Sequence, residues 1–238
     1  MALPKVNEST WYDDTIPSNK QTITFRPFLV KEQKSLLIAA ESEDKTASIR
    51  AILDTISACT REEIDTSKLT TFDVDYLFTR IRTKSVGEST EIGMICVECE
   101  HQNDVKVDLE AAHIQGDILD PIVKLTDNIS VKMRYPNYHE MADIAIKAES
   151  NNTKTGELIF EFMGACMEAI MTEEENFPIK DQTKAEVQEF MDSLTAEQFA
   201  SLSAFVQDAP KLVNEIKFTC EKCGHENKRT MEGMDDFF

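Results

Sequence analysis

The same eight-residue pattern occurs twice in this chain. The pattern C-x-x-C-x-H-x-N reads CVECEHQN at residues 96–103 and CEKCGHEN at residues 220–227. A structural zinc ion takes four ligands in a tetrahedron, and two thiolates at C-x-x-C spacing reach it from one tight turn. We call residues 96–99 the first knuckle and residues 220–223 the second. Two half-sites predict one zinc ion, and the predicted ligands are Cys96, Cys99, Cys220 and Cys223.

Alternating apolar residues flank both knuckles. Ile92 and Met94 precede the first knuckle, and Val105 and Val107 follow it. Alternation with a period of two is typical of strands, so each knuckle is predicted at the tip of a β-hairpin. The second copy, NEIKFTCEKCGHENKRTME, has the same strand, knuckle, strand order. The two hairpins together predict a zinc ribbon that is split between distant parts of the chain.

Two other uses of the knuckles remain open. A thioredoxin-like redox C-x-x-C begins a helix, and neither copy has a helical continuation. His101 and His225 each stand two residues beyond a knuckle and could replace a cysteine ligand or build two separate Cys/His sites. A shell of four thiolates leaves no position for water, so the four-cysteine hypothesis excludes a hydrolytic zinc.

Charge and cysteine usage limit the partners and the compartment. The 44 acidic and 25 basic residues give a net charge of −19, which opposes binding to a phosphate backbone. No apolar run approaches the roughly 18 residues that cross a bilayer, and the first residues do not resemble a signal peptide. Six cysteines without a secretion signal indicate metal ligands or free thiols in a reduced compartment.

Catalytic patterns are missing from the sequence. It contains no G-x-S-x-G, Walker loop, G-x-G-x-x-G or H-E-x-x-H. Cys59 and Cys166 lie in helical patterns with apolar neighbours, which favours small buried side chains over reactive thiols. We therefore predict that the protein is not an enzyme and has no catalytic residues.

The predicted fold class is α+β, with a mainly helical body, short β-hairpins and the split two-knuckle zinc ribbon. A short strand begins near Thr22 and leads into a helix at about Val30, and a hairpin is predicted between Ile118 and Arg134. Helical spacing of apolar residues is typical of the other segments. The predicted helices cover residues 31–41, 44–59, 72–85, 138–149, 155–171, 183–194 and 195–206.

The sequence predicts five consecutive segments. A single α+β unit with a ribbon is expected, because both ribbon halves flank the helices and few linker signals intervene. The segments are an N-terminal arm at 1–20, an α+β part with the first knuckle at 21–136, a helical insertion at 137–213, the second knuckle closing the ribbon at 214–232, and an acidic and aromatic tail at 233–238.

Three stretches make the chain resemble a known family. They are TITFRPFLVKEQKSLLIAAES near the amino terminus, IRTKSVGESTEIGMICVECEHQNDVKVDL around the first knuckle, and MRYPNYHEM at residues 133–141. The runs Phe25–Phe28 and Lys84–Gly87, together with both knuckles, are more specific than any single C-x-x-C. Over roughly residues 15–230 the chain is similar to the baseplate hub and hub-assembly proteins of T4-like tailed bacteriophages.

The resemblance implies a role in the phage tail. The chain would be a hub subunit or a hub-assembly factor or chaperone, with other baseplate hub proteins as partners and with neither nucleic acid nor a membrane as ligand. It would act in the host cytoplasm during assembly, and a subunit would stay in the virion baseplate. The sequence carries no signal for an oligomeric state.

Phe25, Arg26 and Phe28 are the candidate partner-binding residues. In the alternative interpretation, both phenylalanines belong to the core and Arg26 pairs with a carboxylate. The alternative function is a nucleic-acid-binding or transcription-associated regulator with a zinc ribbon. That function needs a basic ribbon face, for which the second knuckle offers only Lys222, Lys228 and Arg229.

Overall fold

The computed structural model describes residues 10–42, 44–61, 64–149 and 155–234. These residues form two compact units, and each unit is described by itself. The first unit contains residues 10–66, 72–115 and 211–234, and the second contains 67–71 and 116–210. No helix among the described residues is long and apolar enough to cross a bilayer.

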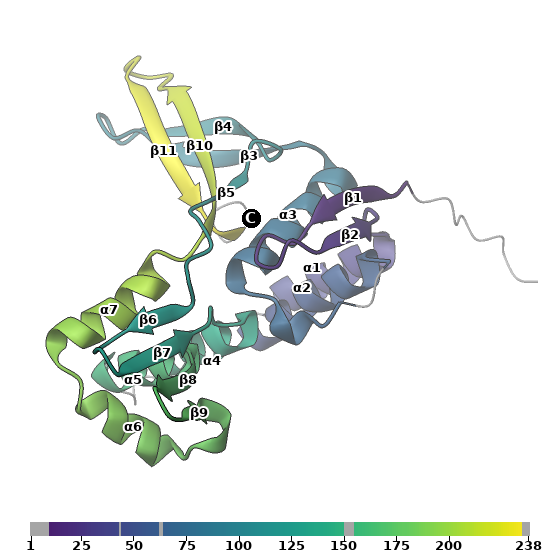
Figure 1. Cartoon of the computed structure of the whole chain (residues 1–238). Helices are drawn as coiled ribbons and strands as arrows, with labels where there is room; N and C mark the ends of the chain where they lie inside the picture. Colours follow the sequence, from purple (N-terminus) through teal and green to yellow (C-terminus); the bar gives the residue numbers. More distant parts are fainter. Residues whose placement is uncertain (1–9, 43, 62–63, 150–154, 235–238) are drawn as a thin grey trace, which may run out of the picture. The chain divides into compact units, whose positions relative to one another are not determined.

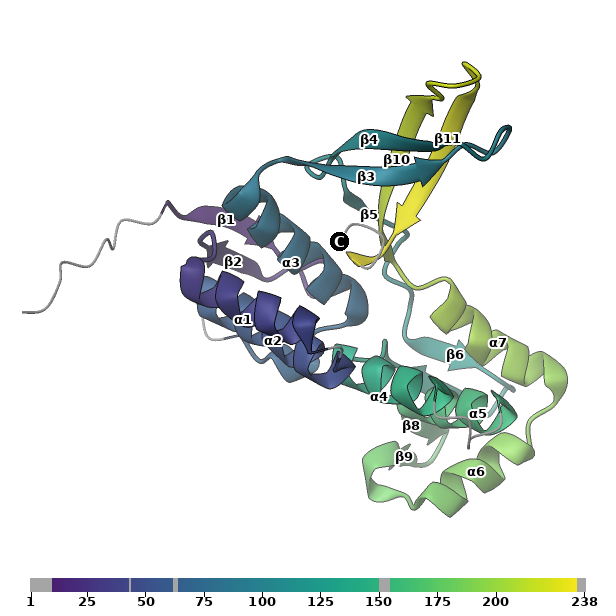
Figure 2. The same cartoon turned by 180° about the vertical axis from the view of Figure 1, so that it is seen from behind.

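The first unit begins with a β-hairpin and three helices (Figures 1 and 2). Strands β1 (Tyr12–Thr15) and β2 (Thr22–Phe25) pair in antiparallel fashion. Helices α1 (Val30–Glu41) and α2 (Lys45–Cys59) follow as an antiparallel pair. Asp44 caps α2, because its carboxylate accepts a hydrogen bond from the Thr46 N–H.

Helix α3 (Thr71–Val86) crosses the first unit and holds the β1–β2 hairpin in place. Asp73 is fully buried in the first turn of α3, and its carboxylate accepts a hydrogen bond of 2.9 Å from the Ser18 N–H. Further along the helix, Arg80 and the Tyr76 hydroxyl both bind the Asp14 carboxylate of β1. Polar contacts thus fix the hairpin at two points along one helix.

The ribbon is made of two hairpins from distant parts of the chain. Strands β3 (Ser89–Ile95) and β4 (Gln102–Asp108) form the first, and β10 (Lys211–Thr219) and β11 (Glu226–Glu232) form the second. The hairpins lie against each other in both views (Figures 1 and 2). Their inward faces share one apolar cluster, formed by Met94, Val105, Val107, Leu109, Ala112, Leu212, Ile216 and Met231.

A short strand, β5 (His113–Gln115), completes the second sheet of the ribbon. It pairs with the start of β10, so that Gln115 lies opposite Lys211. The chain leaves the ribbon after Gln115 and returns to it at Lys211, and the residues between belong to the second unit. The segment from 116 to 210 therefore begins and ends at one pair of neighbouring strands.

The second unit is an antiparallel sheet with helices packed on it. Its strand order is β6-β7-β8-β9, and its helices are α4, α5, α6 and α7. The bounds are β6 (Ile122–Lys124), β7 (Ile129–Met133), α4 (Tyr138–Glu149), α5 (Thr155–Cys166), β8 (Met167–Thr172), β9 (Asn176–Pro178), α6 (Lys184–Asp192) and α7 (Ala196–Gln207). Short 3₁₀ turns cover Thr66–Lys68 and Ile179–Asp181.

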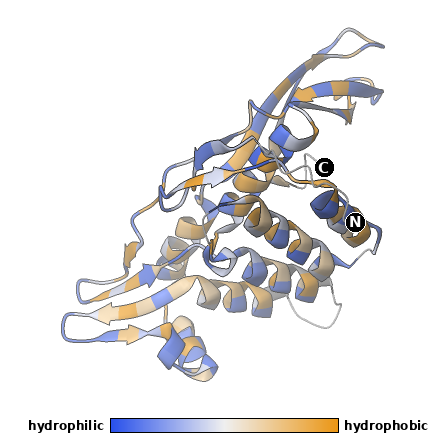
Figure 3. Ribbon diagram, turned by 90° about the vertical axis from the view of Figure 1, so that its right-hand side faces the viewer, coloured by the Kyte–Doolittle hydropathy of each residue, from blue (hydrophilic) through white to orange (hydrophobic). Residues whose placement is uncertain are grey.

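The core of the second unit lies between its sheet and its helices. Val131 and Met133 of β7 are buried with Met167 of β8 against Leu202 and Phe205 of α7. At the start of α4, Arg134 forms two hydrogen bonds with the Glu140 carboxylate, which also accepts from the Asn137 N–H. In Figure 3, apolar and polar residues alternate along the helices and strands, as expected for elements buried on one side.

The predicted mainly helical body is wrong, although the α+β class is right. Among the described residues, helices account for 43% and strands for 29%, in several antiparallel sheets. The helix predicted for 155–171 ends at Cys166, and Met167–Thr172 forms β8. This stretch, MEAIMT, has residues that favour helices, but pairing with β7 on one side and β9 on the other overrides that preference. The five-segment division of the sequence stays a prediction.

Candidate metal centre

The first knuckle closes the β3–β4 hairpin. The Cys96 N–H donates to the His101 carbonyl at 2.9 Å, and the Glu100 N–H donates to the Cys96 carbonyl at 3.0 Å. Glu100 has a φ of 55°, in the left-handed region that favours glycine. The turn geometry therefore demands an unfavourable backbone conformation at Glu100.

The second knuckle repeats this turn at the tip of the β10–β11 hairpin. The Cys220 N–H donates to the His225 carbonyl at 2.8 Å, and the Gly224 N–H donates to the Cys220 carbonyl at 2.9 Å. Here the left-handed position, with a φ of 72°, is occupied by Gly224, which adopts it without strain. The equivalent sequence positions in the two copies therefore have equivalent structures.

The two knuckles bring four thiols together. The Cys96 and Cys223 sulfurs are 3.7 Å apart, the Cys99 and Cys220 sulfurs are 3.6 Å apart, and all four lie within 4.8 Å of one another. Four sulfurs bound to one zinc ion at 2.3 Å would lie about 3.8 Å apart, whereas a disulfide needs about 2.05 Å. The four thiols therefore have the spacing of a tetrahedral metal site, and all are free.

Backbone donors favour ionisation of the first cysteine in each knuckle. Burial opposes ionisation of Cys96, but hydrogen bonds from the Cys99 and Glu98 N–H groups and from Asn227 lower its pKa to about 6. At Cys220, burial is likewise outweighed by donors that include the Cys223 and Lys222 N–H groups, which lower the pKa. The lowered pKa values of Cys96 and Cys220 favour the thiolate form, which is the form that binds a metal.

Cys223 has the opposite tendency. The His225 N–H lowers the pKa of Cys223, but hydrogen bonds with the neighbouring cysteine sulfurs raise it to about 12. Adjacent thiolates repel one another, so four of them are stable together only beside a cation. A divalent metal ion would supply that positive charge.

No histidine nitrogen belongs to the four-cysteine cluster, the possible metal site among the described residues. His101 and His225 contribute backbone carbonyls to the turns instead, and their side chains are half-buried. Because all four sulfurs already share one centre, this geometry favours one four-cysteine site over two separate Cys/His sites.

The asparagine that ends each pattern is part of the same structure. Asn103 and Asn227 are each only 3% exposed, and each hydrogen-bonds to the opposite knuckle. Sequence reasoning considered the cysteines and histidines of the pattern and missed these residues. The signal was available, because asparagine occupies the same position in both copies.

The candidate partner-binding residues lie at the junction of β2 and α1. Phe25 is 2% exposed and Arg26 is 9% exposed, whereas Phe28 is half-buried. The Arg26 Nη2 lies 2.9 Å from the Glu32 Oε1, and both side chains are buried. This arrangement favours the alternative interpretation for Phe25 and Arg26, with Arg26 paired to a carboxylate. Their role in partner binding stays a prediction.

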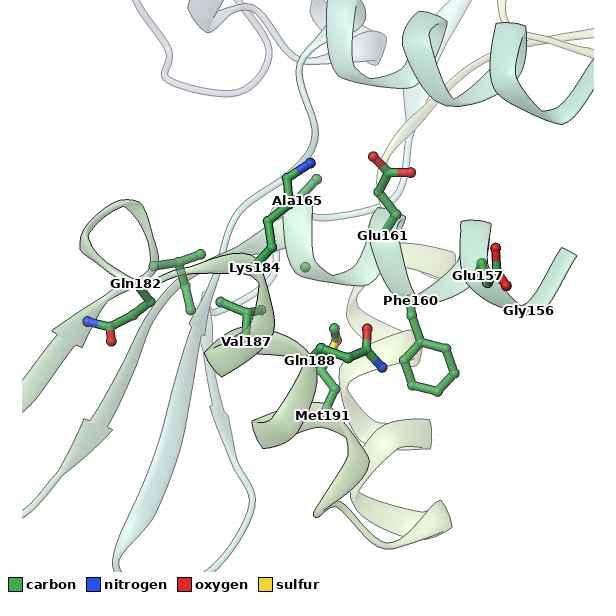
Figure 4. Close-up of a pocket in the computed structure, with 12 residues that line it drawn as sticks. Gly156, Glu157, Phe160, Glu161, Ala165, Gln182, Lys184, Val187, Gln188 and Met191 are labelled. Carbon is green, nitrogen blue, oxygen red and sulfur yellow. The ribbon is translucent and has the colours of Figure 1, made fainter. Parts of the chain in front are cut away.

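A groove in the second unit, of about 900 Å³, runs between α5 and α6 (Figure 4). Phe160, Val187 and Met191 supply apolar walls, and the charged ends of Glu161 and Lys184 point away from them (Figure 4). Glu161 is paired with Lys147 of α4. The lining has no group of metal ligands among the described residues.

Cys59 and Cys166 are expected to resist alkylation in the native protein. Both are 0% exposed, and burial raises the pKa of Cys59 to about 11 and that of Cys166 to about 12. The reactive thiolate is therefore both scarce and inaccessible at neutral pH. Mass spectrometry after iodoacetamide treatment should find both thiols unmodified, and modified once the chain is unfolded in urea. Modification of either thiol under native conditions, at the rate of a free cysteine, would contradict their burial.

Comparison with known proteins identifies the family. The family model described as T4 bacteriophage base plate protein matches residues 10–238, which is nearly the whole chain. No curated protein and no solved structure shows significant similarity to this chain. The match includes both knuckles and the segment between them. The chain therefore belongs to the T4 bacteriophage base plate protein family.

Proposed function

We propose that the protein is a non-enzymatic baseplate hub subunit or hub-assembly factor that acts through contacts with other hub proteins. The family match over residues 10–238 carries this proposal, because it supports a structural role in the phage baseplate. Membership also suggests a component of the virion tail whose partners are other baseplate proteins. The host cytoplasm would be the place of assembly.

The metal is proposed to be a structural zinc ion held by the four knuckle cysteines. Cys96 and Cys220 are buried, Cys99 is half-buried and Cys223 is exposed at the tip of its hairpin. Four thiolates would complete the tetrahedral shell and leave no position for a substrate or an activated water. The zinc would therefore join two hairpins, which supports a structural role for the ribbon.

Binding and particle composition together test the hub proposal. Each hub protein of the same phage would be expressed separately and tested for co-purification with this chain. Quantitative mass spectrometry of finished particles then separates a subunit, which stays in the tail, from an assembly factor, which does not. Normal hub assembly in a phage that lacks the protein would overturn both forms of the proposal.

Phe28 provides a variant for the binding experiment. It lines a groove of about 450 Å³ in the first unit, together with the exposed side chains of Leu37 and Val86. If the predicted partner surface includes this groove, Phe28→Ala should weaken co-purification more than its effect on the unfolding temperature explains. Unchanged binding by a folded variant would remove Phe28 from the predicted surface.

Nucleic-acid binding is not expected. On the exposed side of the second hairpin, Lys211 lies 3.1 Å from Glu232 and Lys228 lies 2.9 Å from Glu215, so nearby carboxylates offset the charge of these lysines. The net charge of −19 adds repulsion toward phosphates. In a gel-shift assay at low salt, where attraction to phosphate is strongest, micromolar protein should leave both DNA and RNA unshifted. A salt-sensitive shift would favour the regulator function instead.

A further inference from the structure

Two buried asparagines bind the knuckles to each other. The Asn103 Oδ1, from the first hairpin, accepts a hydrogen bond of 2.9 Å from the Glu221 N–H in the second knuckle. The Asn227 Oδ1, from the second hairpin, accepts one of 3.0 Å from the Val97 N–H in the first knuckle. Each bonded N–H belongs to the residue directly after the first cysteine of the opposite knuckle. The two bonds are therefore reciprocal.

The amide nitrogens of these side chains hold their own knuckles. The Asn103 Nδ2 donates to the His101 carbonyl at 2.9 Å and to the Met94 carbonyl at 3.4 Å. The Asn227 Nδ2 donates to the His225 carbonyl at 3.0 Å and also lies 3.5 Å from the Cys96 sulfur. The two side chains differ in their second amide contact, because Asn103 reaches the Met94 carbonyl and Asn227 alone of the two reaches a thiol.

Asparagine suits this position because it carries an acceptor and a donor in one planar group. An apolar residue here would remove the acceptor of the Val97 or the Glu221 N–H, although both N–H groups lie in partly buried hydrogen bonds. Aspartate would keep the acceptor but lose the donor, and it would add a negative charge next to the thiols. The chemistry of the site thus selects asparagine over its closest relatives.

We propose that Asn103 and Asn227 are positioning residues that hold the two knuckles in register before any metal binds. Asn227 further stabilises the Cys96 thiolate by donating to its sulfur. The effect on metal retention rests on the proposed zinc site, whereas the joining of the knuckles does not. Zinc would then bind to four thiols that are already arranged around one centre. Its dissociation would be slow, because the asparagine bonds oppose separation of the two knuckles.

The first measurement uses the metal-free full-length chain. In Asn227→Ala the Val97 amide should exchange its hydrogen at least about tenfold faster than in the wild type, and in Asn103→Ala the Glu221 amide should do so. Each variant should affect its own target amide more than the other one. Unchanged exchange at both amides would overturn the proposal, whatever the metal content of the wild-type protein.

The second measurement follows zinc release to a chromophoric chelator. Loss of an outer-sphere partner of a metal ligand typically weakens metal binding by 10–100-fold, and we expect release from Asn227→Ala to accelerate within roughly that range. Asn103→Ala should have a smaller effect, because Asn103 has no contact with a sulfur. In the cobalt-substituted protein, the thiolate-to-metal charge-transfer band should shift in Asn227→Ala and Asn227→Asp but not in Asn103→Ala.

Asn214 provides a matched control on the same ribbon. It is also 3% exposed, and its Nδ2 donates to the Asp108 carbonyl at 2.7 Å, away from both knuckles. Asn214→Ala should lower the unfolding temperature but leave the zinc release rate and the cobalt band unchanged. If Asn214→Ala and Asn227→Ala accelerated zinc release equally, lower stability of the ribbon would explain the faster release. That result would overturn the positioning role of Asn227. A wild-type chain without zinc would refute the metal proposal alone, because hydrogen exchange would still decide whether the asparagines join the knuckles.

Discussion

Replacing any one knuckle cysteine with serine is expected to remove the zinc ion and strongly destabilise the ribbon. The wild-type protein should contain one zinc ion per chain, and Cys96→Ser, Cys220→Ser and Cys223→Ser should each contain almost none. Zinc binding by structural sites is worth about 10–16 kcal/mol in zinc-finger peptides. The unfolding temperature should therefore fall strongly without zinc, although the apolar cluster shared by the two hairpins still holds the ribbon together. Elemental analysis gives the metal content, and thermal unfolding followed by circular dichroism gives the loss of stability.

The two cysteines outside the knuckles provide the control. Cys59→Ala and Cys166→Ala remove buried thiols that are not among the four clustered sulfurs, so both variants should keep their zinc. Chelation of the wild-type protein should reproduce the effect of the knuckle variants. Two metal ions per chain would contradict a single shared site and restore the Cys/His alternative. A folded, metal-free chain that is indifferent to Cys223→Ser would end the zinc proposal.

Arg26→Met is expected to destabilise the first unit by about 3–5 kcal/mol, the typical cost of removing one partner from a buried ion pair. Arg26 Nη2 donates to the Glu32 carboxylate and to the Ala58 carbonyl, both at 2.9 Å. Methionine keeps much of the volume but leaves the Glu32 carboxylate buried without its main partner. Urea unfolding at neutral pH would measure the change in the free energy of unfolding.

Two further variants separate the buried pair from general charge effects. Lys31 is exposed and lies 3.2 Å from the same carboxylate, so Lys31→Met should cost less than about 1 kcal/mol, as for surface ion pairs. Adding Glu32→Gln to Arg26→Met removes the uncompensated charge and should recover part of the loss. If Arg26→Met costs no more than Lys31→Met, Arg26 does not form a stabilising buried pair in solution.

The pH dependence of stability should differ between the wild type and Arg26→Met. Burial raises the pKa of the Glu32 carboxyl, but hydrogen bonds from Arg26, the Leu29 N–H and Lys31 outweigh it and lower the pKa. The stabilisation from Glu32 is therefore present above its unfolded pKa of about 4.3 and is lost as the pH falls through the lower folded value. In Arg26→Met, burial has the larger effect on the Glu32 carboxyl and raises its pKa. The energetic cost of the buried, unpaired Glu32 charge then disappears when the carboxylate is protonated at low pH. The difference in stability should therefore narrow at acid pH.

The ribbon could be predicted from the sequence because its signals are local and occur twice. Alternation around each knuckle predicted β3 with β4 and β10 with β11, and these pairings are confirmed. The four-cysteine cluster followed from the ligand count of zinc, and the structure brings those four thiols together. Helix ends were also visible, since Thr183 and Thr195 both begin capping boxes.

The sheet of the second unit could not be predicted in full because pairing between strands is not local. Nothing within Met167–Thr172 distinguishes a strand from the last turns of a helix, and its partner Ile129–Met133 lies on the other side of two helices in sequence. The asparagine bonds were missed for a related reason. Each bond joins residues more than 100 positions apart, Asn103 to Glu221 and Asn227 to Val97, so they become visible only once the hairpins are placed together.

The separation of the two knuckles also orders events during translation. At about 5–20 residues per second, the 120 residues between Cys99 and Cys220 take roughly 6 to 24 seconds to synthesise. Throughout that time the first hairpin has two thiols and an apolar face but no partner. The proposed metal site can be completed only after the ribosome has synthesised the second knuckle. A chain truncated before Cys220 can never bind zinc with four thiols, so metal occupancy would report that translation has passed this point.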